Sequence, residues 1–125
     1  MFSRLLGIFW RATFSRSTDM DAKMSRLTDA TFKGVLADSA YALVDFYATW
    51  CGPCKVIDPL VNRIAETVFG IDVYKANIED CPNMATVYRV QGVPTLLLLK
   101  KGDVASVRMG SITFTALVKW IEEHR

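Results

Sequence analysis

The residues with the clearest chemical potential are the two cysteines of Trp50-Cys51-Gly52-Pro53-Cys54-Lys55, directly after the apolar segment 42–48. Cysteines at this spacing can close into a disulfide without moving the backbone. When they open a helix, its unpaired backbone N–H groups stabilise a thiolate. The pattern therefore indicates a reactive dithiol. We expect Cys51 to lie nearest the surface and attack, and Cys54 to lie behind it and resolve the mixed disulfide.

Two other interpretations of the cysteines fit less well. A structural disulfide framework usually has several paired cysteines, whereas this chain has three. A zinc site needs about four Cys or His ligands, and Cys81 and His124 would have to complete it without the usual spacing. We therefore predict no metal site. Cys81 is interpreted as a buried, inert thiol, with a regulatory thiol as the alternative.

Composition indicates one globular domain behind a short extension. The chain has 125 residues, and 51% of them are hydrophobic, which is enough to bury one core. Its net charge is +2. Residues 1–18 carry three arginines and no acid, and the remainder is nearly neutral. This balance argues against nucleic-acid binding. No apolar run approaches the roughly 18 residues that a membrane span needs.

Residues 1–23 form a segment of different character, and residues 24–125 form the predicted domain. The segment is amphipathic, with Arg4 and Arg11 away from its apolar side. This composition favours a mitochondrial transit peptide. The alternatives are a helix on an anionic membrane surface, a secretory signal or anchor, and a functionless stretch before a start at Met20 or Met24. A bacterial cytoplasmic or membrane-surface location is thus the alternative, with membrane contact only through residues 1–18.

Periodicity and turn residues predict alternating strands and helices. Strands are expected near residues 25–27, 43–47, 71–77, 94–99 and 104–109, and helices near 29–37, 53–69, 82–88 and 114–123. Alternation gives parallel pairs, and a hairpin at Lys101-Gly102-Asp103 adds an antiparallel edge. The predicted fold class is α/β, with a central mixed sheet and helices on both faces.

Several spaced motifs resemble the thioredoxin family over residues 24–124. They are Val44-Asp45-Phe46-Tyr47-Ala48 before the dithiol, Lys75-Ala76-Asn77-Ile78-Glu79, Gly92-Val93-Pro94-Thr95-Leu96, and Gly110. The resemblance implies the thioredoxin fold, and the Gly-Pro insert marks the reducing members of the family. Tyr47 departs from the tryptophan common in bacterial members, and Cys81 is an additional thiol.

Asp45 is a candidate catalytic group because it is an acid inside an apolar strand, six residues before Cys51. Its neighbours favour burial, and burial raises the pKa of a carboxyl group, which suits a general base for Cys54. The resemblance implies that Lys75, on the adjacent strand, faces Asp45 and modulates its titration.

The resemblance also implies a cis Val93–Pro94 bond and an apolar patch where client proteins dock. The expected substrate-binding residues are Trp50, Gly52, Pro53, Gly92, Val93, Pro94 and Gly110. In this arrangement the backbone of Val93 is free to pair with an extended client strand.

The sequence predicts a thiol–disulfide oxidoreductase that reduces disulfides in client proteins through a Cys51–Cys54 cycle. It holds no flavin or nicotinamide motif, so no cofactor is expected, and by resemblance a thioredoxin reductase supplies the electrons. We expect a monomer. The alternatives are a binding or chaperone module of the same fold, in which the cysteines are dispensable, and a membrane-tethered extracytoplasmic thioredoxin.

Overall fold

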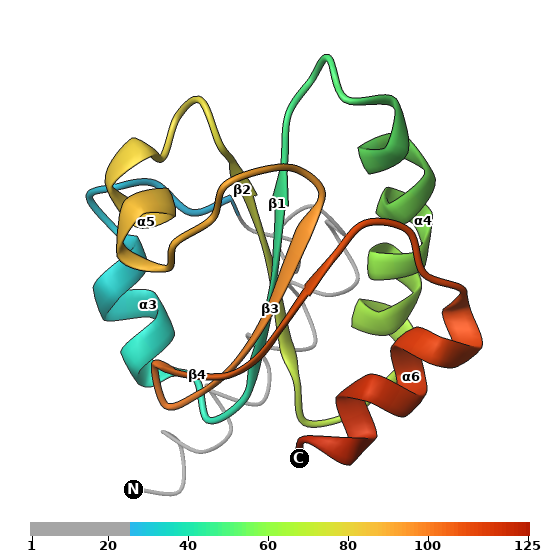
Figure 1. Ribbon diagram of the computed structural model, residues 1–125. Helices are drawn as coiled ribbons and strands as arrows, with labels where there is room; N and C mark the ends of the chain where they lie inside the picture. The colour runs from blue at the N-terminus through green and yellow to red at the C-terminus, as the bar shows by residue number, and fades with distance from the viewer. Residues whose placement is uncertain (1–25) are drawn as a thin grey trace, which may run out of the picture.

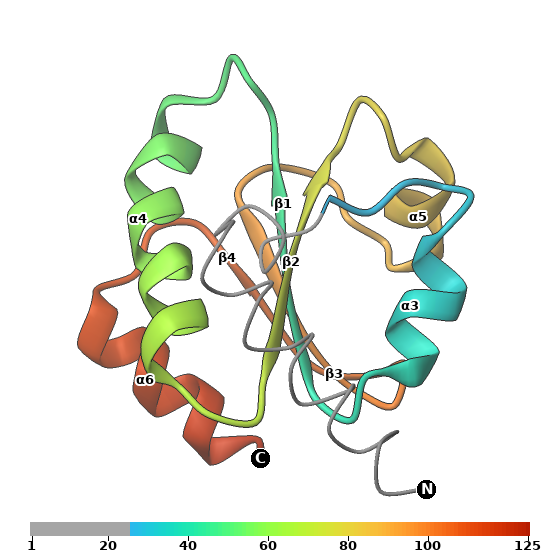
Figure 2. The same ribbon diagram turned by 180° about the vertical axis from the view of Figure 1, so that it is seen from behind.

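A computed structural model of the chain describes residues 26–125 (Figures 1 and 2). Its elements, in chain order, are α3 (Phe32–Asp38), β1 (Ala42–Tyr47), α4 (Gly52–Thr67), β2 (Asp72–Asn77), α5 (Pro82–Val87), β3 (Thr95–Lys100), β4 (Asp103–Met109) and α6 (Phe114–Glu123). The predicted extension over residues 1–23, including the transit peptide, lies outside the described residues.

The four strands form one mixed sheet in the order β2-β1-β3-β4. β1 and β2 are parallel and are joined through α4, whereas β3 runs antiparallel to both β1 and β4. The hairpin between β3 and β4 turns at Lys101 and Gly102, which both have positive φ, of 51° and 87°. Such turns match the twist of paired strands. The predicted mixed sheet and hairpin are confirmed.

Helices cover both faces of this sheet. α4 and α6 lie on one face, and α3 and α5 lie on the other (Figure 1). Side chains alternate along each strand, so Leu43 packs under α4 and α6 while Val44 and Phe46 pack under α3 and α5. Asp45 shares the face of Leu43, and it is therefore placed beneath α4.

The first predicted strand and helix are shorter than expected. Among the described residues the strand is a single bridge between Arg26 and Lys75. The helix begins at Phe32 rather than near residue 29, because residues 29–31 form a turn that leads into it. In this turn the carbonyl of Thr28 accepts the N–H groups of Thr31 and Phe32 over 3.1 and 3.0 Å. The N–H of Thr28 donates to the Oγ1 atom of Thr31 over 3.1 Å, a contact of the kind that caps a helix.

The long helix α4 begins where the dithiol predicts it. Cys51 is its N-cap residue, and Pro53 lies in the first turn, where a missing N–H costs nothing. The last helix, α6, also starts as predicted, because Thr113 accepts a hydrogen bond from the Ala116 N–H over 3.2 Å. Within residues 26–125, no helix is both long and apolar enough to cross a membrane.

Candidate active site

The two cysteines lie at the N-terminus of α4 and form a disulfide, with their Cα atoms 5.3 Å apart. The Sγ atom of Cys51 accepts the backbone N–H of Cys54 over 3.1 Å. A thiolate at Cys51 can accept the same hydrogen bond, and the helix dipole adds positive potential there. The geometry thus favours the charged form of Cys51 in particular.

Exposure does not separate the two cysteines, and the prediction that Cys51 lies nearer the surface is wrong for this disulfide-bonded form. Each residue exposes only 4% of its surface. Both are covered because the bonded sulfur atoms pack in one small cluster with Ala48, with Tyr47, Ile78 and Val93 against it. The position at the helix N-cap is what distinguishes Cys51 from Cys54.

Asp45 is buried, as its apolar neighbours predict, with 1% of its surface exposed. Burial is the main cause that raises the pKa of Asp45 from its ordinary value of 3.8 to about 7. Its Oδ1 atom has no hydrogen-bond partner among the described residues. The carboxyl group therefore changes charge near neutral pH and has an oxygen available to accept a proton.

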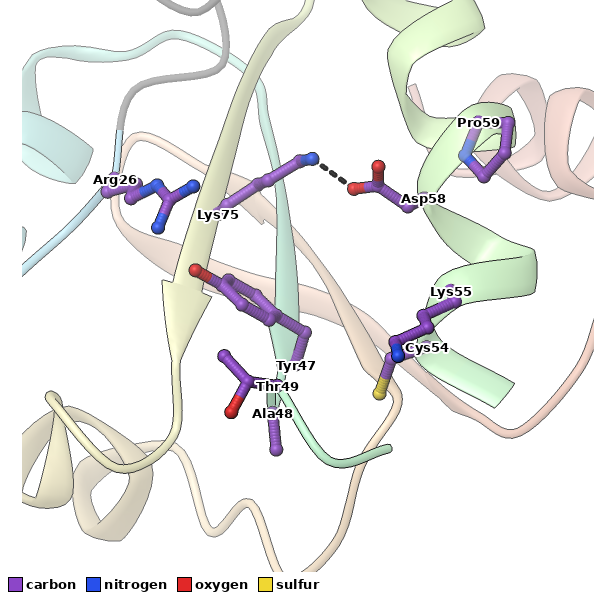
Figure 3. A pocket seen from close by; sticks show the side chains of 9 residues that line it. All are labelled: Arg26, Tyr47, Ala48, Thr49, Cys54, Lys55, Asp58, Pro59 and Lys75. Atoms are coloured by element: carbon purple, nitrogen blue, oxygen red, sulfur yellow. Dashed lines mark hydrogen bonds and ion pairs between the residues drawn. The ribbon is translucent and has the colours of Figure 1, made fainter. Parts of the chain in front are cut away.

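Lys75 is the register partner of Asp45 across the parallel pair of β1 and β2. The positive charge of Lys75 lowers the pKa of Asp45, which agrees with the predicted modulation. The ammonium group, however, forms its ion pair with the carboxylate of Asp58 on α4 (Figure 3). The sequence-based interpretation named Lys75 and did not identify Asp58.

A signal for Asp58 was present in the sequence. Asp58 follows Cys54 by four residues, which places both on the same face of α4. An acid at this position therefore points toward whatever lies beside the second cysteine. Lys75 on β2 pairs with Asp58 there, and both line the same pocket as Cys54.

A pocket of about 360 Å³ opens between α4 and β2, beside the second cysteine (Figure 3). Its lining residues are Arg26, Tyr47, Ala48, Thr49, Cys54, Lys55, Asp58, Pro59 and Lys75. The Lys75–Asp58 ion pair crosses this pocket. Cys54 and the groups that surround Asp45 are therefore parts of one site.

The predicted docking residues lie in two groups around the dithiol. Val93 packs against the cysteine cluster and is joined to Pro94 by a cis bond. The N–H of Gly110 donates to the carbonyl of Pro94 over 3.1 Å, which holds Gly110 beside this bond. Gly92 is half-buried, and a Cβ atom at this position would lie 3.7 Å from the Cε atom of Met109, in ordinary van der Waals contact.

The second group of docking residues is exposed. Trp50 exposes 68% of its surface, and Gly52 and Pro53 are also exposed in the first turn of α4. The Trp50 Nε1–H donates to the Oε2 atom of Glu79 over 2.9 Å, which orients the indole ring. Glu79 belongs to a motif that carried the resemblance, but sequence reasoning gave it no role.

Cys81 stands apart from this site. It is fully buried, and its Sγ–H donates to the carbonyl of Leu27 over 3.0 Å. Burial raises the pKa of the Cys81 thiol, with smaller contributions from Asp29 and Asp80. A buried thiol with a raised pKa is unreactive, which agrees with its interpretation as an inert cysteine.

Comparisons with known proteins agree with this geometry. The family profile described as Thioredoxin matches residues 23–123. A thioredoxin from Buchnera aphidicola is 40% identical over 104 residues, which cover 82% of this chain and 96% of the relative. The chain belongs to the thioredoxin family. Thiol–disulfide oxidoreductase activity, of the protein-disulfide reductase type, follows from the family, the fold and the Cys51–Cys54 pair.

Members of the thioredoxin family from several compartments are similar to this chain. A chloroplastic M-type thioredoxin from Chlamydomonas reinhardtii is 35% identical over 118 residues, covering 93% of this chain and 84% of the relative. The oxidised mitochondrial thioredoxin 3 of Saccharomyces cerevisiae superposes with a TM-score of 0.75 at 29% identity, covering 84% of this chain and 99% of that one. Similar proteins thus occur in bacteria, chloroplasts and mitochondria.

Proposed function

We propose that this domain reduces disulfides of client proteins in two steps, with Cys51 as the attacking thiol, Cys54 as the resolving thiol and Asp45 as the general base. The observation that carries the proposal is the hydrogen bond from the Cys54 N–H to the Sγ atom of Cys51. It supports a negative charge on Cys51 before any client binds.

In the first step, the Cys51 thiolate attacks one sulfur atom of a client disulfide. A bond forms between Cys51 and that sulfur, and the client's S–S bond breaks. The other client sulfur leaves as a thiolate and takes a proton from water. The product is a mixed disulfide with one free client thiol.

In the second step, Cys54 gives its thiol proton to the Asp45 carboxylate and attacks the Sγ atom of Cys51. The bond between Cys51 and the client breaks, and the second client thiolate leaves and is protonated. Two electrons have then passed to the client, and Cys51 and Cys54 are joined as the structure has them. A carboxyl group with a pKa of about 7 suits this transfer, since it is partly ionised at neutral pH.

Client binding is assigned to the two docking groups that flank the dithiol. The exposed Trp50 and the half-buried Gly92 and Val93 offer a mostly apolar surface. An extended client segment can lie against the backbone near Val93, so that recognition depends more on main chain than on side chains. The docking surface can then bind clients whose sequences differ.

The partners and location follow from the family and from the N-terminal composition. A thioredoxin reductase returns electrons to the Cys51–Cys54 disulfide, and the domain over residues 24–125 works as a monomer. Residues 1–23 direct the protein to mitochondria, where it reduces disulfide-containing clients. N-terminal sequencing of the mature protein from its own cell tests this location, because removal of the extension is expected there.

Trapping of clients tests the order of attack. In a Cys54→Ser variant, Cys51 still attacks but nothing releases the client, so covalent complexes accumulate on a non-reducing gel. The matched Cys51→Ser variant is expected to trap none. Equal trapping by both variants would contradict the assigned order. No trapping by either, together with unchanged binding of clients, would favour the binding or chaperone module.

A further inference from the structure

Asp58 is the acidic residue of the active-site pocket, and the two-step exchange leaves it without a role. It lies on α4 one helical turn after Cys54, and both residues line the pocket. Its side chain is 45% exposed, whereas that of its partner Lys75 is only 15% exposed. In this ion pair the side chain of Lys75 extends from β2 toward α4 (Figure 3).

This ion pair changes the surroundings of Asp45. The register places Lys75 next to Asp45, yet the ammonium donates to Asp58, and the Oδ1 atom of Asp45 has no partner among the described residues. The ammonium group of Lys75 thus acts on two carboxyl groups, and it contacts that of Asp58 directly. Asp45 keeps only the longer-range attraction of Lys75, and it also lies in the negative field of Asp58.

No other group around Asp45 takes over the influence that the Asp58–Lys75 ion pair has on it. Across the sheet, the register partner on β3 is the apolar Leu96, and α6 contributes Leu117 and Ile121 to the core on this face. The remaining charged or titratable residues of the pocket are Arg26 at its β2 side, Lys55 on α4, and Tyr47 and Cys54. Arg26 lies over the ring of Tyr47, 5.8 Å from its centre.

We propose that Asp58 is a positioning residue for the resolving step, which holds Lys75 away from Asp45 and thereby keeps the Asp45 carboxylate basic enough to take the Cys54 proton. The inference rests on the proposed role of Asp45 as general base. Burial, the field of Asp58 and the attraction of Lys75 act together on the pKa of Asp45, and only the first two raise it. Without Asp58, Lys75 is free to pair with Asp45, and the carboxylate becomes a weaker base.

An Asp58→Asn variant tests this role without removing any reacting group. We measure the titration of the Asp45 carboxyl by carbon-13 NMR in the oxidised full chain, with an Asp45→Asn variant to assign the signal. The expected result is a fall of about one pH unit in the Asp45 midpoint. Asp58→Glu keeps the charge and is expected to preserve the midpoint. Glu66→Gln removes one exposed acidic charge from the same helix, two turns away, and is the matched control.

The resolving step is measured on the same variants as the decay of the mixed disulfide in a single turnover with a disulfide-bonded peptide. In Asp58→Asn, the pH at which this rate rises is expected to fall together with the Asp45 midpoint. An unchanged Asp45 midpoint in Asp58→Asn would overturn the inference and leave the base role of Asp45 intact. If the midpoint moves and the decay profile does not, the positioning role also fails. In that case we compare the pH dependence of the decay rate in the wild-type protein with the titration of Asp45. If the decay rate does not follow this titration, the assignment of Asp45 as the general base is itself wrong.

Discussion

The backbone N–H of Cys54 lies 3.1 Å from the Sγ atom of Cys51, within hydrogen-bond distance. The bond exists because Cys51 occupies the N-cap of α4 and Cys54 is the third residue after it. Hydrogen bonding favours the charged form of an acceptor thiol. The helix N-terminus therefore favours ionisation of Cys51, and within residues 26–125 no such hydrogen bond reaches the Sγ atom of Cys54.

Thiol reactivity should follow this asymmetry. In the reduced protein at neutral pH, iodoacetamide is expected to alkylate Cys51 much faster than Cys54 or Cys81, because the thiolate is the reacting form. Mass spectrometry of peptides at successive times measures each rate. Cys81 serves as the internal control, since burial raises the pKa of its thiol and its Sγ–H is a hydrogen-bond donor rather than an acceptor. Equal rates at Cys51 and Cys54 would remove the basis for naming Cys51 the nucleophile.

Substitution of Asp45 by Asn should stabilise the protein in a pH-dependent way. The folded-state pKa of about 7 lies above the ordinary 3.8, so the folded protein holds this proton more tightly than the unfolded chain. The stability from this proton is complete below about pH 4 and is lost as the pH rises to about 7. The Asn variant has no such loss, because its side chain does not titrate.

The gain at pH 8 is at most about 4 kcal/mol in the free energy of unfolding, and it should nearly vanish at pH 4. Urea unfolding of the oxidised proteins at both pH values measures it. The variant should also resolve mixed disulfides more slowly, because Cys54 loses its proton acceptor. A gain that is equal at pH 4 and pH 8 would contradict the raised pKa of Asp45.

The hydrogen bond between Trp50 and Glu79 should affect clients more than stability. Glu79→Ala removes the acceptor of the indole N–H. Both residues are exposed, so the free energy of unfolding should change by less than about 0.5 kcal/mol. We expect the KM for a protein substrate to rise about two- to tenfold, which corresponds to the loss of one hydrogen bond. Glu79→Gln retains an acceptor oxygen and is the control; equal KM values for Ala and wild type would exclude a role in docking.

Removal of the extension should leave the catalytic domain intact. A chain that begins at Met24 is expected to fold and to reduce protein disulfides as well as the full chain, because residues 1–23 contribute nothing to the alternating pattern of strands and helices. Thermal unfolding and turnover of the two chains measure this. Loss of folding or of turnover in the shorter chain would show that the domain boundary is wrong.

Much of the fold and the dithiol could be predicted from the sequence because their signals are local. Thr113 and the apolar period after it predict α6 with the limits that the structure has. The acid within the apolar strand β1 predicts the burial of Asp45, since a strand in the middle of a sheet is covered on both faces. In each case neighbouring residues carry the information, and no distant contact is needed to interpret them.

The features that required the folded chain all join residues far apart in the sequence. Lys75 pairs with Asp58 because α4 packs on the sheet beside β2. Trp50 contacts Glu79 because β1 and β2 are parallel, so that the loops after them begin at the same edge of the sheet. The equal burial of Cys51 and Cys54 depends likewise on Val93, which reaches them from another loop. Local patterns determine which face of an element is apolar. The packing of helices on the sheet decides which charged side chain finds which partner.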